Sequence, residues 1–459
     1  MSNKIDLASF QNGFKGTIIK PEDDNYDEAR KIWNAVIDRK PELIVQVAES
    51  NDVITAIESA RKNNLDITVR GAGHNIAGNS ISNDSMMIDF SKMKRVKVDK
   101  EKKIAFVEPG ATLKDFDEEA QKYGLATPVG INSTTGISGL TLGGGFGWLS
   151  RNYGLTIDNL LSAEVITVDG KKLRASEKEN TDLFWAIRGG GGNFGIVTEF
   201  EFKLHKVGPE ILGGLLVFPF NQAKQVITQY RDFILTTPWE FNAFTVLRKA
   251  PPLPFLPEAV HGKEVVVAAI FVESDFKQGE ELIEKIRSFG DPVGEHIGKQ
   301  PYINWQKAFD PLLTPGARNY WKTHNFTELS DEALDIIIEY AGKLPSPHCE
   351  IFIACLQGKS NQVSMDAMAY PNRDLKFILN VHGRWENAEQ DKEVINWARD
   401  FFNKTLKYAS DGAYVNFMTE DEGDRVAKAY GSNYTRLSQI KKKYDPDNIL
   451  HYNQNIKPD

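Results

Sequence analysis

The strongest constraint on the fold of this chain is the uneven distribution of its glycines. They are dense between Gly71 and Gly195, in the segments RGAGHN, VEPGATL, GISGLTLGGGFGW and IRGGGGNFGIVTEF, and much sparser afterwards. Glycine permits positive φ angles and a close approach of the backbone to a ligand, and successive loop amides form concavities that bind anions. Several such loops in one domain therefore indicate a site for the pyrophosphate group of a nucleotide.

These loops do not match the two most familiar nucleotide-binding motifs. No G-x-G-x-x-G stands between a strand and a helix with an acidic residue about 20 positions further on, and no G-x-x-x-x-G-K-[ST] is present. Taken singly, each loop is more typical of a structural turn than of a binding site. Only the series of loops as a whole favours a ligand site.

Length and hydrophobic patterning predict two domains. The 459 residues exceed what one hydrophobic core usually supports. Helix-like and strand-like segments alternate in the first part, as in residues 51–64 and 65–71. From about Val207 long strands are separated by amphipathic helices, which indicates a second domain with one broad sheet covered on one face. The proline-rich segment APPLPFLPE, residues 250–258, is expected to form a surface loop or a domain edge.

The composition argues against several kinds of partner. A net charge of −8 disfavours nucleic acid and anionic membranes, because both favour a clustered basic surface. No apolar run approaches the roughly 20 residues that cross a bilayer, and no apolar leader segment is visible, so a cytoplasmic location is expected by default. Cys349 and Cys355 lie on one strand-like segment, too far apart for a disulfide, and neither suggests a metal site.

The motifs, taken in order, carry a resemblance to a known family. The segments VRGAGHNIAGNS, VEPGATL, GLTLGGGFGWLSRNYGLTIDN, DLFWAIRGGGGNFGIVTEF and YDPDNILHYNQNI resemble those of FAD-linked oxidases of the vanillyl-alcohol oxidase (PCMH-type FAD-binding) superfamily. The berberine-bridge-enzyme-like, or reticuline-oxidase-like, branch is the most similar, from about Lys40 onward. The resemblance implies an α+β fold with a PCMH-type FAD-binding domain and a substrate domain of one antiparallel sheet covered by helices.

The domain boundaries follow from the same resemblance. Residues 1–207 would form the FAD-binding domain, with a core at about 38–207, and residues 208–413 would form the substrate-binding domain. Residues 414–459 would be a berberine-bridge-like tail that returns to the FAD domain. The tail begins with a helical pattern, which is expected to stop at the YDP sequence.

FAD is the cofactor that the resemblance implies, and His74 is its implied covalent anchor. In the family, the loop matching RGAGHN binds the flavin pyrophosphate through backbone amides, and its histidine bonds to the flavin C8 methyl group. A neutral imidazole is a suitable nucleophile for that bond. The alternative is a loop histidine that only hydrogen-bonds to the backbone. Many relatives add a second bond from a cysteine whose position here is Asn132, so a single linkage is expected, as in the 6-hydroxynicotine oxidase type.

Other residues of these motifs are expected to contact FAD. The implied set, matched position by position, comprises Arg70, Gly71, Ala72, Gly73, Asn75, Gly78, Asn79, Pro109, Val129, Gly130, Thr135, Gly136, Gly139, Leu142, Gly143, Gly144, Gly147, Asp158, Asn159, Gly195, Ile196, Val197, Tyr452, Asn453 and Asn455. The two tail asparagines would hydrogen-bond the flavin ring system; otherwise the tail would be a polar coil.

On the substrate side, the strand-like segment LKFILNVHGRW carries the main candidates. Alternation places Asn380 and His382 on one face. Asn380 stands where many relatives carry Glu or Gln, and its amide could orient a substrate but could not act as a base. His382 is then the candidate base, because its ordinary pKa lies near neutral pH. The alternative is a structural histidine at the end of a strand.

Two further segments supply additional candidates. GAYVNFMTED is expected to be a strand that places Tyr414 and Asn416 near the flavin, where both could contact substrate, although Tyr414 could equally pack between the domains. TPGARNYWKTHNF offers Tyr320, Trp321 and His324 as pocket or packing residues.

The expected function is FAD-dependent oxidation of a small or medium organic substrate. The substrate, an alcohol, an amine or a sugar, would pass a hydride to the covalently bound flavin, and dioxygen would reoxidise the flavin to give hydrogen peroxide. Two alternatives stay open: a dehydrogenase that uses another electron acceptor, and a flavin-binding protein without turnover, which the amide of Asn380 motivates.

Overall fold

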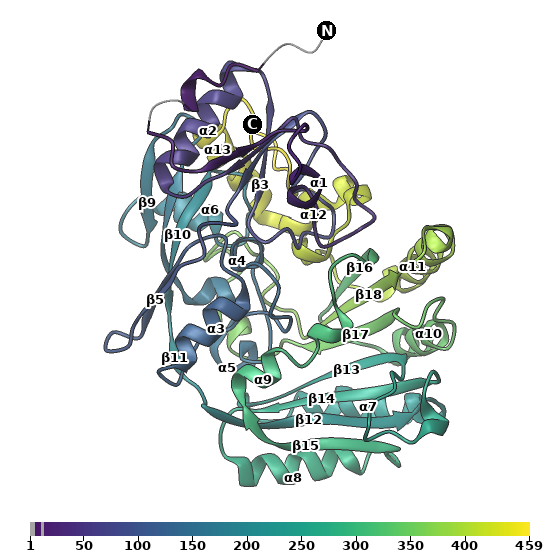
Figure 1. Ribbon diagram of the computed structural model, residues 1–459. Coiled ribbons are helices and arrows are strands. Elements are labelled where there is room, and N and C mark those ends of the chain that lie inside the picture. The colour runs from purple at the N-terminus through teal and green to yellow at the C-terminus, as the bar shows by residue number, and fades with distance from the viewer. Residues whose placement is uncertain (1–4, 11–12) are drawn as a thin grey trace.

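The computed structural model describes residues 5–10 and 13–459, which form one lobe of two larger sheets with a two-stranded ladder and a second lobe of one broad sheet (Figure 1). The first sheet has the strand order β1-β2-β4-β3, built from β1 (Thr17–Ile19), β2 (Leu43–Gln46), β3 (Asp66–Arg70) and β4 (Ser85–Asp89). β2 and β3 both run parallel to β4, and helix α2 (Ser50–Lys62) connects them. β3 leads directly into the glycine loop 71–80, which therefore leaves the carboxyl ends of the parallel strands in this sheet.

The second sheet of this lobe is antiparallel, with the order β5-β6-β10-β8-β9. Its strands are β5 (Val96–Asp99), β6 (Ile104–Val107), β8 (Leu160–Ile166), β9 (Lys172–Ser176) and β10 (Ile196–Lys203). Helices α3 (Leu113–Gln121) and α6 (Thr181–Ile187) share its hydrophobic core. The remaining short elements are β7 (Leu125–Ala126), β11 (His205–Lys206), α1 (Tyr26–Ala29), α4 (Ile137–Leu142), α5 (Ser150–Tyr153) and α9 (Tyr302–Gln306).

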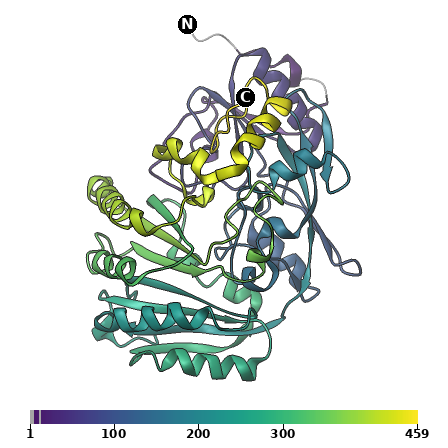
Figure 2. The same ribbon diagram turned by 180° about the vertical axis from the view of Figure 1, so that it is seen from behind.

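The broad sheet of the second lobe has seven antiparallel strands in the order β15-β12-β14-β13-β17-β18-β16. These are β12 (Glu210–Pro219), β13 (Phe241–Lys249), β14 (Glu264–Val272), β15 (Gly294–Pro301), β16 (Arg318–Phe326), β17 (Glu350–Cys355) and β18 (Phe377–Trp385). Helices α7 (Ala223–Ile234), α8 (Phe276–Arg287), α10 (Asp331–Ala341) and α11 (Asp391–Thr405) lie on one side of it (Figures 1 and 2).

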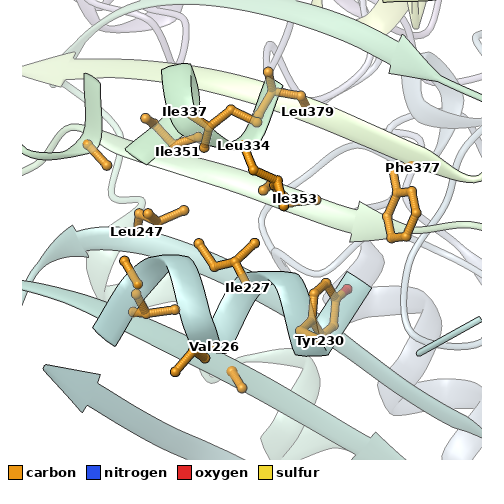
Figure 3. Packing of buried hydrophobic residues seen from close by; sticks show 14 of the residues in the cluster. Val226, Ile227, Tyr230, Leu247, Leu334, Ile337, Ile351, Ile353, Phe377 and Leu379 are labelled. Atoms are coloured by element: carbon orange, nitrogen blue, oxygen red, sulfur yellow. The ribbon is translucent and has the colours of Figure 1, made fainter. Parts of the chain in front are cut away.

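Strand alternation assigns the two faces of this sheet to two different cores. On the helix side, Leu247, Ile351 and Leu379 pack beneath apolar residues of α7 and α10, among them Ile227 and Ile337 (Figure 3). The opposite face contributes a separate apolar cluster with residues of the first lobe. The sheet thus turns its second face toward the glycine loops. The fold predicted from the sequence, α+β with one antiparallel sheet covered by helices, is confirmed.

The C-terminal segment crosses back to the first lobe after α11, through α12 (Val426–Tyr430) and α13 (Tyr434–Tyr444) (Figure 2). Helix α13 ends at the YDP sequence, as predicted. The ammonium group of Lys441 is fully buried and donates to the carbonyls of Asn193 and Leu450 and, at 2.6 Å, to the carboxylate of Asp445. These bonds fasten the tail beside the last glycine loop.

The strand predicted for GAYVNFMTED is wrong, because residues 415–417 form a single 3-10 turn. The alternation of side chains has another cause. Ala413, Val415 and Met418 enter the core of the first lobe, whereas Tyr414 enters the apolar cluster against the broad sheet. The segment runs between two cores and has no neighbouring strand along residues 412–421, so its period of two does not reflect sheet pairing.

Candidate active site

A cavity of about 340 Å³ lies between the glycine loops, the second face of the broad sheet and the C-terminal tail. Many residues predicted from the sequence line it together. From the predicted FAD-binding set these are Gly71, Ala72, Gly73, His74, Asn75, Asn79, Pro109, Gly130, Thr135, Gly136, Gly139, Leu142, Gly143, Gly195, Ile196, Val197, Tyr452 and Asn453, and from the substrate side Asn380, His382, Tyr414, Asn416 and Trp321. Segments distant in the sequence thus converge on one space.

Other residues of the predicted set lie outside the cavity lining, namely Arg70, Gly78, Val129, Gly144, Gly147, Asp158, Asn159 and Asn455. The charged members have structural partners. Arg70 makes a buried ion pair with Asp89, and Asp158 pairs with Arg373. Asn159 donates to backbone carbonyls. These side chains support the loops that form the cavity.

The glycine loops fit a large ligand that approaches the backbone closely. A Cβ atom added at Gly139 or Gly192 would meet no protein atom within 4 Å, and both residues line the cavity, so a side chain there would project into the free space. At Gly136, by contrast, a Cβ would lie 2.8 Å from the Cβ of Ala72, because the loops pack on each other. The cavity is thus walled partly by bare backbone, as a nucleotide site requires.

Unpaired polar atoms around the cavity also indicate a polar ligand. Within the part of the chain that the structure describes, buried atoms without a hydrogen-bond partner occur on the lining residues Ser80, Asn132, Trp321, Asn380, Tyr430 and Asn453. Buried polar groups are normally paired in folded proteins. A bound molecule with several donors and acceptors, such as a flavin nucleotide, would supply the missing partners.

His74 is held in the cavity wall by one stacking contact and one hydrogen bond. Its ring stacks on Trp33 with centroids 4.5 Å apart, and its Nε2 lies 3.1 Å from Oγ1 of Thr134. That hydroxyl donates to Oδ1 of Asn132 at 2.7 Å, so its oxygen is left to accept a proton from His74. The hydrogen therefore belongs on Nε2, and Nδ1 keeps its lone pair. Burial, aided by the nearby charge of Arg384, lowers the pKa of His74 to about 3.

On the wall that the broad sheet forms, four strands place four polar or aromatic side chains directly beside one another. Arg248 on β13 pairs in register with Glu350 on β17, Glu350 with His382 on β18, and His382 with Trp321 on β16. The Glu350 carboxylate accepts from Nδ1 of His382 at 3.1 Å and from Arg248 at 2.8 Å. The ring of Trp321 meets His382 edge-on at 4.3 Å. Glu350, His382 and Trp321 all line the cavity.

The Glu350–His382 pair has the charge state of a carboxylate beside a neutral imidazole. Burial raises the pKa of Glu350, but the charge of Arg248 and the hydrogen bond from His382 outweigh it and lower that pKa to about 2. Burial lowers the pKa of His382, although Glu350 opposes this shift. Because Nδ1 carries the hydrogen donated to Glu350, the Nε2 lone pair of His382 is the one that can accept a proton. Oδ1 of Asn319, 3.4 Å away, would then accept from Nε2–H.

Tyr414 and Asn416 fasten the tail to the glycine loop. The Tyr414 hydroxyl oxygen accepts from the backbone N–H of Gly145 and from Nδ2 of Asn416, both at 3.1 Å. Asn416 also donates to the carbonyl of Leu140. Both side chains line the cavity, so they border the site while packing between the lobes.

Tyr320 and His324 lie away from the cavity. The hydroxyl of Tyr320 donates to Asp421 at 2.7 Å, and Nε2 of His324 donates to the backbone carbonyl of Phe402 at 2.9 Å. Both therefore have structural partners on the side of the sheet that the helices cover.

Sequence reasoning missed Glu350, Trp33 and Thr134. Glu350 stands at the start of the strand-like segment CEIFIAC, where a charged residue opens an otherwise apolar run. That was an available signal, but the segment drew attention only for its cysteines. Trp33 and Thr134 carry no local signal, because only the folded chain brings them to His74.

Comparison with known proteins agrees with this geometry. A model of the FAD binding domain matches residues 41–176, and a model described as berberine and berberine like matches residues 413–457. An FAD-linked oxidoreductase of Dictyostelium discoideum is 33% identical over 458 residues, covering 98% of this chain and 97% of that protein. This chain belongs to the FAD-linked oxidoreductases.

Two further comparisons show proteins that are similar to this FAD-linked oxidoreductase in sequence or in fold. (R)-6-hydroxynicotine oxidase of Paenarthrobacter nicotinovorans is 26% identical over 462 residues and covers 97% of each chain. The crystal structure of 6-hydroxy-D-nicotine oxidase from Arthrobacter nicotinovorans superimposes with a TM-score of 0.87 at 25% identity, covering 97% of this chain and 98% of that one. The chain is thus an enzyme with an FAD-binding domain, and a flavin-binding protein without turnover is set aside.

Two negative findings apply to the described residues. None of their helices combines the length and apolar character that crossing a membrane requires. No group of three or more His, Cys, Asp or Glu residues is arranged there to hold a metal ion.

Proposed function

We propose that this enzyme is an oxidase that removes two electrons and two protons from a small organic alcohol, amine or sugar. The observation that carries the proposal is the Glu350–His382 pair, which lines the same cavity as the glycine loops and His74. When bound there, FAD would take a hydride from the substrate carbon and pass both electrons to dioxygen, which leaves with two protons as hydrogen peroxide. A dehydrogenase that uses another acceptor is the alternative.

The side chains of the sheet would handle the substrate proton. Asn380 has a buried Oδ1 without a partner in the described structure, so it can accept a hydrogen bond from a substrate O–H or N–H group. His382, two residues along the same strand, would accept the proton at Nε2 as the substrate loses its hydride. Glu350 and Asn319 would then both accept from the charged ring, which stabilises it.

The proposed function can be tested through the absorbance of the flavin, which falls when a substrate reduces it. The purified holoenzyme is mixed without oxygen with a panel of alcohols, amines and sugars, and flavin absorbance is followed. Bleaching by one substrate class, and peroxide formation after air is admitted, are expected. If no compound bleaches the flavin, the assignment of substrate class fails. If bleached flavin reoxidises only slowly in air, the enzyme is a dehydrogenase.

Covalent attachment of FAD through His74 alone is a separate part of the proposal. The neutral ring with a free Nδ1 lone pair supports it, and Asn132 at the family's cysteine position supports a single bond. Acid-precipitated protein is expected to stay yellow, whereas the His74→Ala variant should release its flavin. Colourless precipitate from the parent protein, or yellow precipitate from the variant, would contradict the attachment point.

A further inference from the structure

A second, smaller cavity adjoins the candidate active site. It measures about 70 Å³, and Ile131, Leu313, Glu350 and Phe352 line both cavities. The other lining residues are Trp148, Leu215, Val217, Phe244, Val246, Arg248, Ala250, Pro251, Leu253, Leu256, Val265, Val267, Ala269, Phe309 and Leu312. We refer to this space as the side pocket. Its border with the main cavity includes the Glu350 carboxylate that holds His382.

The walls of the side pocket come from several parts of the chain, including strand β17 and residues 309–313. Strands β12, β13 and β14 supply its floor from the second face of the broad sheet. Trp148 from the first lobe stacks on Phe244 with centroids 4.4 Å apart, and Phe244 meets Phe352 edge-on at 5.3 Å. The proline-rich segment 250–258 supplies Pro251, Leu253 and Leu256. This segment is therefore a wall beside the candidate active site and not only a surface loop.

The chemistry of the side pocket is almost entirely apolar. Among its lining side chains, only Trp148, Arg248 and Glu350 carry polar atoms. Arg248 and Glu350 already bind each other at 2.8 Å. A hydroxyl-rich group would thus lose its bonds to water and find few partners, whereas each buried methylene would gain affinity by roughly fourfold.

We propose that the side pocket binds a short apolar arm of the substrate, so that the substrate is an alcohol or amine with an alkyl branch and not a sugar. This inference rests on the proposed oxidase function and narrows its substrate class. A water molecule occupies about 30 Å³ of liquid, so a cavity of this size accepts an arm of about two or three carbon atoms. The four residues that the side pocket shares with the lining of the His382 cavity are what assign the pocket to the substrate.

Binding of two probe molecules tests the inference without requiring turnover. Benzyl alcohol and 4-isopropylbenzyl alcohol differ only by a three-carbon arm, and each is titrated into anaerobic holoenzyme while the flavin difference spectrum is recorded. We expect the isopropyl compound to bind at least about tenfold more tightly. Equal affinity, or no spectral change with the isopropyl compound up to its solubility limit, would overturn the inference.

Variants of the side pocket make the test specific. Val267→Phe fills the pocket and should reduce the preference to within about twofold while the affinity for benzyl alcohol stays the same. Leu253→Ala enlarges it and should shift the preference toward 4-tert-butylbenzyl alcohol, which keeps the test valid if the first variant does not fold. Phe255→Ala is the matched control, because Phe255 lies on the same segment outside the pocket lining and stacks on His296.

Failure of this inference and failure of the proposed function give different results. If Val267→Phe still prefers the isopropyl compound, the side pocket is not the cause of the preference. This conclusion holds whatever the enzyme oxidises. A preference that disappears in that variant supports the pocket even if neither alcohol bleaches the flavin, and only the bleaching and peroxide measurements then decide the oxidase assignment.

Discussion

His74 shows how neighbouring groups can fix the hydrogen-bonding state of a side chain. Its position in a glycine-rich loop brings the backbone close to the cavity, but the loop does not decide which ring nitrogen is reactive. That choice follows from Thr134, whose hydroxyl proton is already donated to Asn132. The residue in the family's cysteine position is therefore part of the hydrogen bonds that orient the histidine.

Replacing Thr134 tests this arrangement. Thr134→Val keeps the shape but removes the acceptor for Nε2–H, so the ring can hold its hydrogen on Nδ1 and the fraction of covalently bound flavin should fall severalfold. Thr134→Ser keeps the hydroxyl and should retain the parent level. The measurement is flavin fluorescence of the denatured polypeptide on a gel, relative to total protein. Full covalent loading in the valine variant would show that the tautomer does not matter.

The Glu350–His382 pair gives a prediction about pH. The pKa of His382 is lowered from its ordinary value of 6.5, and the proposed function needs the neutral ring as the base, so the acid limb of the profile of kcat/KM should lie below pH 6.5. Glu350→Gln removes the carboxylate that raises the His382 pKa, so the limb should move to still lower pH as kcat falls by about 10–100-fold.

His382→Gln serves as the companion variant in the same measurement. It should abolish the acid limb and reduce kcat by about 100-fold or more, because no imidazole remains to accept the proton. If the limb persists in this variant, another group is the base.

At the scale of elements, the order of strands in the broad sheet limits which site residues can be predicted from the sequence. Alternation along residues 375–385 was enough to place Asn380 and His382 on one face, and both line the cavity. The neighbours of β18 are β17 and β16, and β13 follows β17, an order that no local pattern encodes. The sequence alone therefore does not identify Arg248 and Glu350 as partners of His382, although Glu350 lies on a segment that is recognisable as a strand.

The glycine loops were more predictable than the substrate wall for a physical reason. A backbone that approaches a ligand closely needs glycine at particular positions, so this requirement is visible in a short stretch of the sequence. A side-chain wall can be built from any strands that the sheet brings together. The segment around Tyr414 shows the converse: its alternation was read as a strand, but the side chains alternate between the cores of two lobes.

The buried contacts between helix α13 and the tail lead to a prediction about the free energy of unfolding. Lys441→Met removes the charge that three buried acceptors share and leaves the Asp445 carboxylate without its buried cation, so the free energy of unfolding should fall by about 3–5 kcal/mol. Lys443→Met, two residues along the same helix, removes an exposed pair with Asp182 and a contact with the ring of Tyr444, and should cost about 1 kcal/mol or less. Urea unfolding of both variants gives the comparison; equal losses would contradict it.

For the whole molecule, buried histidines predict sensitivity to acid. The pKa values of His205 and His324 are each lowered by burial from 6.5 to about 4. Between these values the unfolded chain binds protons that the native protein does not, so the buried His324 costs up to about 1.4 kcal/mol of stability for each pH unit between 6.5 and 4, and the partly exposed His205 costs less. His324→Gln should therefore reduce the loss of unfolding free energy between pH 6.5 and pH 4. An unchanged slope would exclude this contribution.

The return of the tail to the first lobe also has a consequence for the order of events during synthesis. Leu450, Tyr452, Asn453 and Gln454 line the same cavity as His74, yet the ribosome makes them only after both sheets of the first lobe and the whole broad sheet. Domains fold as units while the chain emerges. The glycine loops are therefore translated before their cavity can close, and the complete flavin site can arise only once residues 450–454 have been translated.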